Sequence, residues 1–290
     1  MELELKKRLS TAGVLVGIIL LSAALALLDP NFNWIFLSLG FIAVAFAAFE
    51  FASIQSQPTG SLSTKVLYFL GLFLPQLGTL YTLSLFGFSA PDMLARFGLL
   101  IPIAMCFTSF LLGLLWMMLD SRNGLEHAGF ISRDYFLGLL LIGFGGCTLI
   151  ELAILPGAPR QIIWFLLVVC MNDSAAYFVG KTVGGPKLAA KLSPGKTVSG
   201  SVGGLLAGTL IGAIFYWLVP DFESYKIAIV LSFLIVIAAQ LGDLAKSFIK
   251  RVHGVKDSGS ILPGHGGVLD RIDGLLAASP VLYLFLYSLL

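Results

Sequence analysis

Long apolar runs constrain this chain more than any other feature of its sequence. About nine of them reach the roughly 20 residues that a helix needs to cross the hydrocarbon core of a bilayer. These runs are residues 9–28, 33–54, 66–87, 97–119, 135–155, 161–180, 201–219, 226–248 and 273–290. Hydrophobic residues make up 58% of the 290 positions, charged residues only 12%, and the mean hydropathy is +0.95. The sequence therefore predicts an all-α, polytopic integral membrane helix bundle of about nine transmembrane helices.

The distribution of Lys and Arg predicts the orientation in the membrane. If the N-terminus is cytoplasmic, fifteen of the 18 basic residues fall on the cytoplasmic side, and only Arg96, Arg160 and Lys226 fall outside. Cytoplasmic loops carry an excess of Lys and Arg. We therefore expect the protein to lie in the cell (inner) membrane with its N-terminus in the cytoplasm. Both long polar loops, 181–200 and 249–272, would then face the cytoplasm, within reach of soluble nucleotides.

The chain divides by function at about residue 130. We expect residues 1–130 to form N-terminal transmembrane helices that serve as scaffold or dimer surface. Residues 131–290 contain both long polar loops and are expected to form the catalytic part.

Charges of both signs gather in residues 247–273, which read SFIKRVHGVKDSGSILPGHGGVLDRID. An Asp, Lys or Arg at the centre of a transmembrane helix costs roughly 2.5 to 3.5 kcal/mol. So dense a cluster in an apolar chain indicates a working site that faces protein or water. The plainer interpretations are that loop lysines only set topology, that Arg271 pairs with Asp270 or Asp273, and that His265 is a turn residue.

Carboxylates at the ends of the last two apolar runs predict a cation site. Asp270 and Asp273 are three residues apart and share a face if they are helical. A hairpin of the eighth and ninth helices would bring Asp243 toward them. Mg²⁺ takes one or two carboxylates together with phosphate oxygens. We expect Asp243, Asp270 and Asp273 to bind the metal, with Asp173 as a fourth candidate; Asp173 and Asp243 could instead form a structural pair.

Two segments resemble the CDP-diacylglycerol synthases, also called phosphatidate cytidylyltransferases. The first is residues 247–273, where every position of the family pattern is matched. The second is residues 172–204, with an Asp-x-x-Ala-Tyr-x-x-Gly stretch and a Ser-Pro-x-Lys-Thr run. One departure is that Ser199 stands where the family often has an acidic residue. The matching residues of the second segment are Asp173, Ala176, Tyr177, Gly180, Ser193, Pro194, Lys196, Thr197, Gly203 and Gly204.

The resemblance implies a reaction and its partners. Phosphatidate would attack the α-phosphate of CTP, giving CDP-diacylglycerol and pyrophosphate. The family uses Mg²⁺, so we expect one or two divalent ions, with a monovalent ion left open. Membrane lipids and a second copy of the chain are the other expected partners, and no nucleic acid is expected.

The chemistry of this reaction assigns roles to the polar residues. Nucleotidyl transfer needs aligned substrates and neutralised charge rather than a protein nucleophile. Arg grips phosphate bidentately, Lys acts as a point charge, and glycines let backbone N–H groups approach phosphate. The expected catalytic residues are Asp243, Lys250, Arg251, Lys256, Asp257, Asp270, Arg271 and Asp273. The expected substrate-binding residues are Asp173, Lys187, Ser193, Lys196, Thr197, Gly264, His265, Gly266 and Gly267.

Other functions would require sequence features that can be looked for in this chain. A secondary transporter would use Asp173 and Asp243 as ion sites, but no convincing internal repeat accompanies them. A CDP-alcohol phosphatidyltransferase would need two further spaced aspartates, and no Asp or Glu follows Asp273. A CTP-dependent polyprenol kinase stays open, because the lipid acceptor leaves little trace in a sequence.

Overall fold

Helices dominate the computed structural model, which describes residues 17–29, 32–55, 62–86, 100–120, 125–219, 222, 224–262 and 266–289. A helix overlaps each of the nine apolar runs within these residues. Within the described residues, four helical segments are long and apolar enough to cross a membrane: Asn33–Gln55, Ser132–Glu151, Ala158–Thr182 and Tyr225–Val252. The all-α membrane bundle is confirmed, whereas the count of nine spans stays a prediction.

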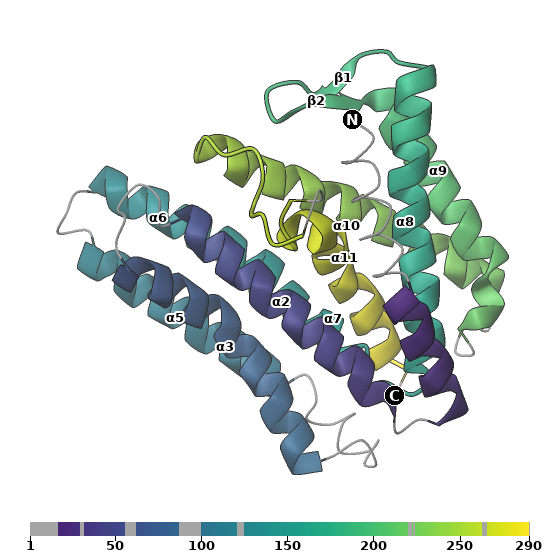
Figure 1. The fold of residues 1–290 in the computed structure, drawn as a ribbon, viewed down its shortest axis with the longest axis horizontal. Coiled ribbons are helices and arrows are strands. Elements are labelled where there is room, and N and C mark those ends of the chain that lie inside the picture. Colours follow the sequence, from purple (N-terminus) through teal and green to yellow (C-terminus); the bar gives the residue numbers. More distant parts are fainter. Residues whose placement is uncertain are drawn as a thin grey trace.

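The first half of the chain supplies one layer of the bundle, in which α3 packs between α2 and α5 (Figure 1). Residues 125–151, which follow α5 in the chain, are helical throughout and contain a π-helical stretch between two α-helices. The elements are α2 (Asn33–Gln55), α3 (Leu62–Phe86), α5 (Leu100–Asp120), α6 (Leu125–Gly138), η3 (Leu139–Phe144) and α7 (Gly145–Glu151).

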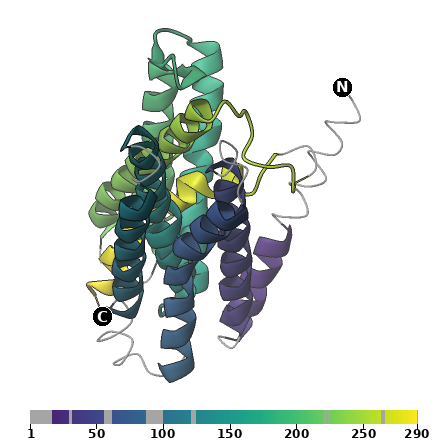
Figure 2. The ribbon, with the colours of Figure 1, turned by 90° about the vertical axis from the view of Figure 1, so that its left-hand side faces the viewer.

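The second half pairs α8 with α9 and α10 with α11. A short antiparallel hairpin between α8 and α9 was not predicted; it pairs Lys187 with Thr197 and Ala189 with Ser193. Figures 1 and 2 show this hairpin projecting beyond one end of the bundle. The elements are α8 (Ala158–Thr182), β1 (Lys187–Ala189), β2 (Ser193–Thr197), α9 (Val198–Ile214), η4 (Tyr216–Leu218), α10 (Tyr225–Val252) and α11 (Leu269–Tyr287).

A stripe of glycines lets α9 approach its neighbours closely. Gly200, Gly204, Gly208 and Gly212 are the buried residues of this helix and recur every fourth position. Small residues at this spacing allow helix backbones to touch in a bilayer, where no hydrophobic effect drives helices together. The stripe therefore fixes the distance between α9 and α8, the two helices that frame the hairpin.

The two halves of the chain share one buried core. Phe51 of α2 and Leu72 of α3 belong to the same apolar cluster as Ile249 of α10 and Leu276 of α11. Helix α11 also packs against both α2 and α7. The charged ends of α10 and α11 are thus held by helices from both halves.

Filling the glycine stripe should destabilise the fold. A Cβ at Gly208 would lie 2.6 Å from Cγ2 of Val236 and 3.1 Å from the carbonyl oxygen of Val168. Overpacking of this kind costs about 1–3 kcal/mol, so Gly208→Val should lower the thermal unfolding midpoint measured in detergent. Leu210→Ala, on the exposed face of α9, is the control and should leave the midpoint nearly unchanged. An unchanged midpoint in Gly208→Val would contradict the close packing.

Candidate active site

A single buried ammonium group organises the charged residues at the junction of α10 and α11. Nζ of Lys246 lies 2.7 Å from Asp273, 3.2 Å from Asp243 and 3.6 Å from Asp270. The side chain of Lys246 is 8% exposed and that of Asp273 is 9% exposed. The predicted hairpin thus brings the three carboxylates together, but around a lysine. We refer to Lys246, Asp243, Asp270 and Asp273 as the lysine-centred cluster.

Asp270 extends this cluster into the loop that precedes α11. Lys250 donates to its Oδ1 at 2.6 Å, and the backbone N–H of Ser258 donates to its Oδ2 at 2.8 Å. The hydroxyl oxygen of Ser258 lies 3.0 Å from the same Oδ2. The i, i+4 spacing of Lys246 and Lys250 places both ammonium groups on one face of α10. One carboxylate therefore joins α10, α11 and the loop between them.

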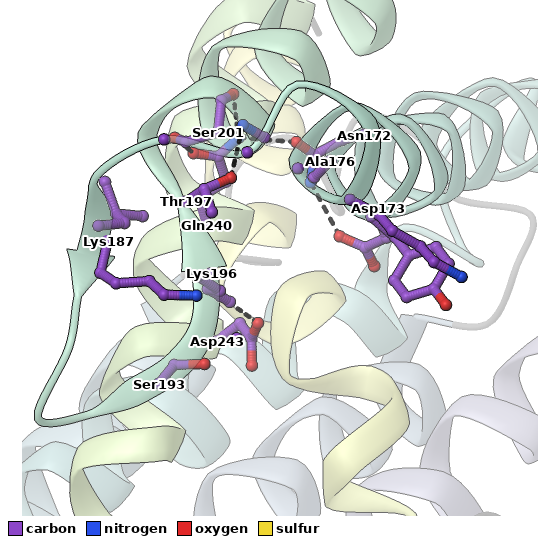
Figure 3. Close-up of a pocket in the computed structure, with 18 residues that line it drawn as sticks. Asn172, Asp173, Ala176, Lys187, Ser193, Lys196, Thr197, Ser201, Gln240 and Asp243 are labelled. Carbon is purple, nitrogen blue, oxygen red and sulfur yellow. Dashed lines mark hydrogen bonds and ion pairs between the residues drawn. The ribbon is translucent and has the colours of Figure 1, made fainter.

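Asp243 connects the cluster to a cavity of about 660 Å³. Lys196 of the hairpin forms an ion pair with its carboxylate, and Figure 3 shows this lysine reaching across from β2. Asp173, Tyr177 and Lys187 also line the cavity. Asp243 is 36% exposed, so it stands between the dry cluster and the open cavity.

A polar network from three helices holds Asp173 in place (Figure 3). The amide of Asn172 donates to Asp173 at 2.9 Å and accepts from Gln240 at 2.8 Å. Gln240 in turn accepts from the hydroxyl of Ser201 at 2.5 Å and donates to the backbone carbonyl of Ser201 at 3.0 Å. Asn172 lies on α8, Ser201 on α9 and Gln240 on α10, so these amides fix how the three helices meet beside the cavity.

The Ser-Pro-x-Lys-Thr run forms β2 and starts α9. Thr197 caps the helix by accepting from the N–H of Gly200 at 3.1 Å. Ser199, at the position where the family often has an acid, donates to the carbonyl of Gly184. Ser193 and Thr197 both line the cavity. The run therefore fixes the hairpin on α9 and presents Lys196 to the cavity.

The other predicted residues of the second loop differ in their contacts and exposure. Arg251 donates from Nε to the carbonyl of Leu192 at 3.2 Å, which joins the two polar loops. Lys256, Asp257 and Arg271 are exposed. Gly264 and His265 lie outside the described residues.

The two glycines that follow His265 differ in their surroundings. Gly266 has φ +79°, a left-handed conformation that suits glycine, and its carbonyl accepts from the N–H of Leu262. Gly267 is buried against Ser258 and Glu50. Its lack of a side chain thus makes room for these neighbours, which is a role besides the predicted approach to phosphate.

Four residues of this region were missing from the predicted site: Lys246, Glu50, Asn172 and Gln240. Glu50 accepts from three donors of the second loop and α11. Its one signal in the sequence is a charge inside an apolar run, which marks a functional candidate. Lys246 carries the same signal near Asp243, whereas the two amides carry none.

The carboxylates can be compared with the needs of a magnesium ion. Among the described residues, no group of three His, Cys, Asp or Glu side chains is arranged to hold a metal, and Lys246 lies among the three predicted ligands. Asp173 and Asp243, in contrast, both line the cavity. Mg²⁺ usually takes one or two carboxylates with substrate phosphates and water. A magnesium ion that arrives with a phosphate ligand would therefore meet these two carboxylates in the cavity, where Asp243 pairs with Lys196 and Lys246.

The fold and the site define an integral membrane protein with a lysine-lined polar cavity suited to an anionic ligand. The sequence model described as the Cytidylyltransferase family matches residues 6–289. The chain therefore belongs to the cytidylyltransferase family, as residues 172–204 and 247–273 predicted.

Curated relatives carry the name phosphatidate cytidylyltransferase. The protein of Brucella suis biovar 1 (strain 1330) is 46% identical over 154 residues, covering 49% of this chain and 54% of the relative. That of Bacillus subtilis (strain 168) is 39% identical over 162 residues, covering 56% and 59%. That of Rickettsia bellii (strain RML369-C) is 34% identical over 196 residues, covering 60% and 84%. The matches thus span about half the length of the first of these relatives.

Removing the central ammonium group should leave buried carboxylates uncompensated. Breaking a buried ion pair by deleting one partner costs about 3–5 kcal/mol, so Lys246→Met should lower the unfolding midpoint strongly. The double variant Lys246→Met/Asp273→Asn should regain part of the loss, because one negative charge is removed with the positive one. Thermal unfolding in detergent measures both effects.

Lys226→Met provides the matched control, because Lys226 is an exposed residue at the other end of α10. Its midpoint should stay close to that of the wild type. Equal midpoints for the wild type and Lys246→Met would show that Lys246 does not hold the cluster together.

Proposed function

We propose that this protein is a phosphatidate cytidylyltransferase, which transfers the cytidylyl group of CTP to phosphatidate. The observation that carries the proposal is that the first family-like segment lines the cavity and also contacts α10, which leads into the second segment. Lys196 from the first segment pairs with Asp243, which lies just before the second, and Arg251 of the second bonds to Leu192 of the first. Family membership favours this reaction over a secondary transporter.

The proposed reaction exchanges one phosphoric anhydride bond for another. An oxygen of the phosphatidate phosphate attacks the α-phosphorus of CTP and forms the new P–O–P bond. The bond from the α-phosphorus to the bridging oxygen of the β-phosphate breaks, and pyrophosphate leaves with that electron pair. No protein nucleophile is required, because the attacking phosphate is already anionic.

Lysines at the cavity would neutralise the charge that gathers when two phosphate substrates meet. Phosphatidate is a phosphomonoester and carries about −1.5 to −2 at neutral pH. Lys187 and Lys196 line the cavity where the triphosphate would lie. Lys250 and Arg251, at the end of α10, are placed to receive the lipid phosphate. Asp270 would hold Lys250, and Asp243 would hold Lys196 at the cavity, before the substrates arrive, which limits the reorganisation needed in the transition state.

A magnesium ion belongs to this proposal, with Asp173 and Asp243 as the residues that would hold it. When bound, it would supply positive charge to the phosphate oxygens. The Asn172–Gln240–Ser201 network would keep Asp173 oriented toward the cavity. Asp270 and Asp273 would act through Lys246, by keeping Asp243 in position.

The proposed setting is the inner membrane, with the cavity and both polar loops at the cytoplasmic face. Four apolar helices support a membrane location, and the excess of Lys and Arg in these loops supports their cytoplasmic side. We also propose a homodimer, with the helices of residues 1–130 as the candidate dimer surface.

Cytidylyl transfer can be measured on the purified protein in detergent with CTP, phosphatidate and Mg²⁺. We expect label from CTP in the lipid product together with pyrophosphate release. Asp270→Asn or Asp273→Asn should abolish turnover, on the order of 100-fold or more, because each removes one charge from the lysine-centred cluster. Lys226→Gln, at the exposed far end of α10, should keep wild-type turnover.

The products decide between the proposal and its alternatives. Normal turnover in both Asp variants would contradict a role of the cluster in catalysis. Transfer of the γ-phosphate of CTP to a polyprenol, without CDP-lipid, would favour the kinase. Gradient-driven uptake into liposomes without nucleotide consumption would favour the transporter.

Removal of divalent cations tests the metal proposal separately. A chelator should abolish transfer, and added Mg²⁺ should restore it. Asp243→Asn should weaken metal use, so turnover should fall even at Mg²⁺ concentrations that saturate the wild type. Turnover that is unaffected by the chelator would contradict the magnesium assignment.

A further inference from the structure

Glu50 is a buried carboxylate that joins the first half of the chain to the second polar loop. It lies on α2 and is 2% exposed. It accepts hydrogen bonds from the backbone N–H groups of Val268 and Leu269, at 3.0 and 2.9 Å, and from the hydroxyl of Ser258, at 3.0 Å. All three donors are more than 200 residues away along the chain.

Glu50 lies at the N-terminus of α11, where its carboxylate caps the helix. The first N–H groups of a helix have no partner within the helix. Val268 stands at the N-cap of α11 and makes no side-chain capping bond, so Glu50 takes over this function from another helix. Its negative charge also lies at the positive end of the helix dipole. The Glu50 carboxylate on α2 thus accepts hydrogen bonds from the first backbone N–H groups of α11.

Ser258 connects Glu50 to the lysine-centred cluster. Its hydroxyl lies 3.0 Å from both the Glu50 and the Asp270 carboxylates, and its N–H donates to Asp270 at 2.8 Å. Asp270 then receives Lys250 at 2.6 Å. A continuous hydrogen-bonded path therefore runs from α2 through the loop to the basic end of α10.

Two glycines of the second loop leave room for this contact. A Cβ at Gly259 would collide with the Glu50 carboxylate, and a Cβ at Gly267 would collide with both Glu50 and Ser258. The backbone of the loop therefore wraps directly around the carboxylate. Such close wrapping is typical of a built contact rather than of a chance burial.

We propose that Glu50 is a positioning residue of the active site, which sets Asp270 and Lys250 through Ser258 and the start of α11. Glu50 is not among the residues that line the described cavity, so it acts without touching the substrates. The inference rests on the proposed cytidylyl transfer for its catalytic consequence. It also gives the first half of the chain a part in the site beyond scaffold or dimer surface.

The test compares Glu50→Gln with the wild type in the cytidylyl transfer assay. The amide keeps the size of the side chain but places an N–H group toward backbone donors, so the loop should shift. Misplacement of about 1 Å costs on the order of 100-fold in rate; we expect kcat to fall at least tenfold, while KM for CTP stays near the wild-type value. Glu151→Gln is the matched control, since Glu151 is a buried carboxylate of α7 outside the cavity, and should keep wild-type kcat.

A measurement without turnover separates this inference from the proposed function. Hydrogen exchange of peptides that cover residues 255–272 should be faster in Glu50→Gln than in the wild type, and unchanged in Glu151→Gln. If the wild type transfers no cytidylyl group, the proposed function fails, while faster exchange would still support the structural contact. Unchanged exchange would overturn the inference whatever the wild-type protein catalyses.

Ser258→Ala tests the path itself and remains informative if Glu50→Gln does not fold. This variant keeps the cap on α11 and removes the hydroxyl that links Glu50 to Asp270, so kcat should again fall. In the double variant Glu50→Gln/Ser258→Ala, the loss should be no larger than that of the more affected single variant, because both remove one path. Wild-type kcat in Ser258→Ala, or simple addition of the two losses, would overturn the proposal.

Discussion

The contact of one buried ammonium group with three carboxylates is the interaction on which the rest of the site depends. Lys246 lies within 3.6 Å of Asp243, Asp270 and Asp273, and charges in such an apolar setting persist only when they are paired and hydrogen-bonded. The remaining features follow from that requirement. Helices α10 and α11 must stay side by side, the second loop must return to Asp270, and Lys196 must come from the hairpin to satisfy the exposed side of Asp243. These ion pairs thus act together with the shared apolar core to bring the two polar loops near each other.

The surrounding helices make this charged arrangement rigid. The glycine stripe of α9 brings α8, α9 and α10 close enough for Asn172, Ser201 and Gln240 to bond to one another. On the other side, α2 reaches the start of α11 through Glu50. The polar network on α8, α9 and α10 therefore supports the cavity, whereas the Glu50 contact supports the start of α11 beside the lysine-centred cluster. Both supports use uncharged or singly charged groups whose hydrogen bonds are completed inside the protein, as the low dielectric of a membrane requires.

The structural features that depend on a local sequence pattern were predicted from the sequence. Apolar runs located the helices, and the three-residue spacing of Asp270 and Asp273 correctly placed both on one face beside Asp243. The centre of the cluster was not predicted, because the contacts of Lys246 depend on how α10 is rotated about its axis against α11. Glu50 was not predicted for a similar reason: its partners lie more than 200 residues away, and no local motif marks such a contact. The hairpin was missed because its strands are only three and five residues long. The roles of the site residues in catalysis remain predictions.

The two lysine partners of Asp243 affect how the cavity can bind an anion. Lys196 is the partner on the cavity side and Lys246 the partner on the buried side. If Lys196 swings toward an incoming phosphate, Asp243 keeps Lys246 as its second cation and does not become an unpaired charge. The hairpin lysine can therefore be exchanged between protein and ligand at low electrostatic cost, and can return when the ligand leaves. Arrival and departure of a charged phosphate ligand would then need no rearrangement deeper in the bundle.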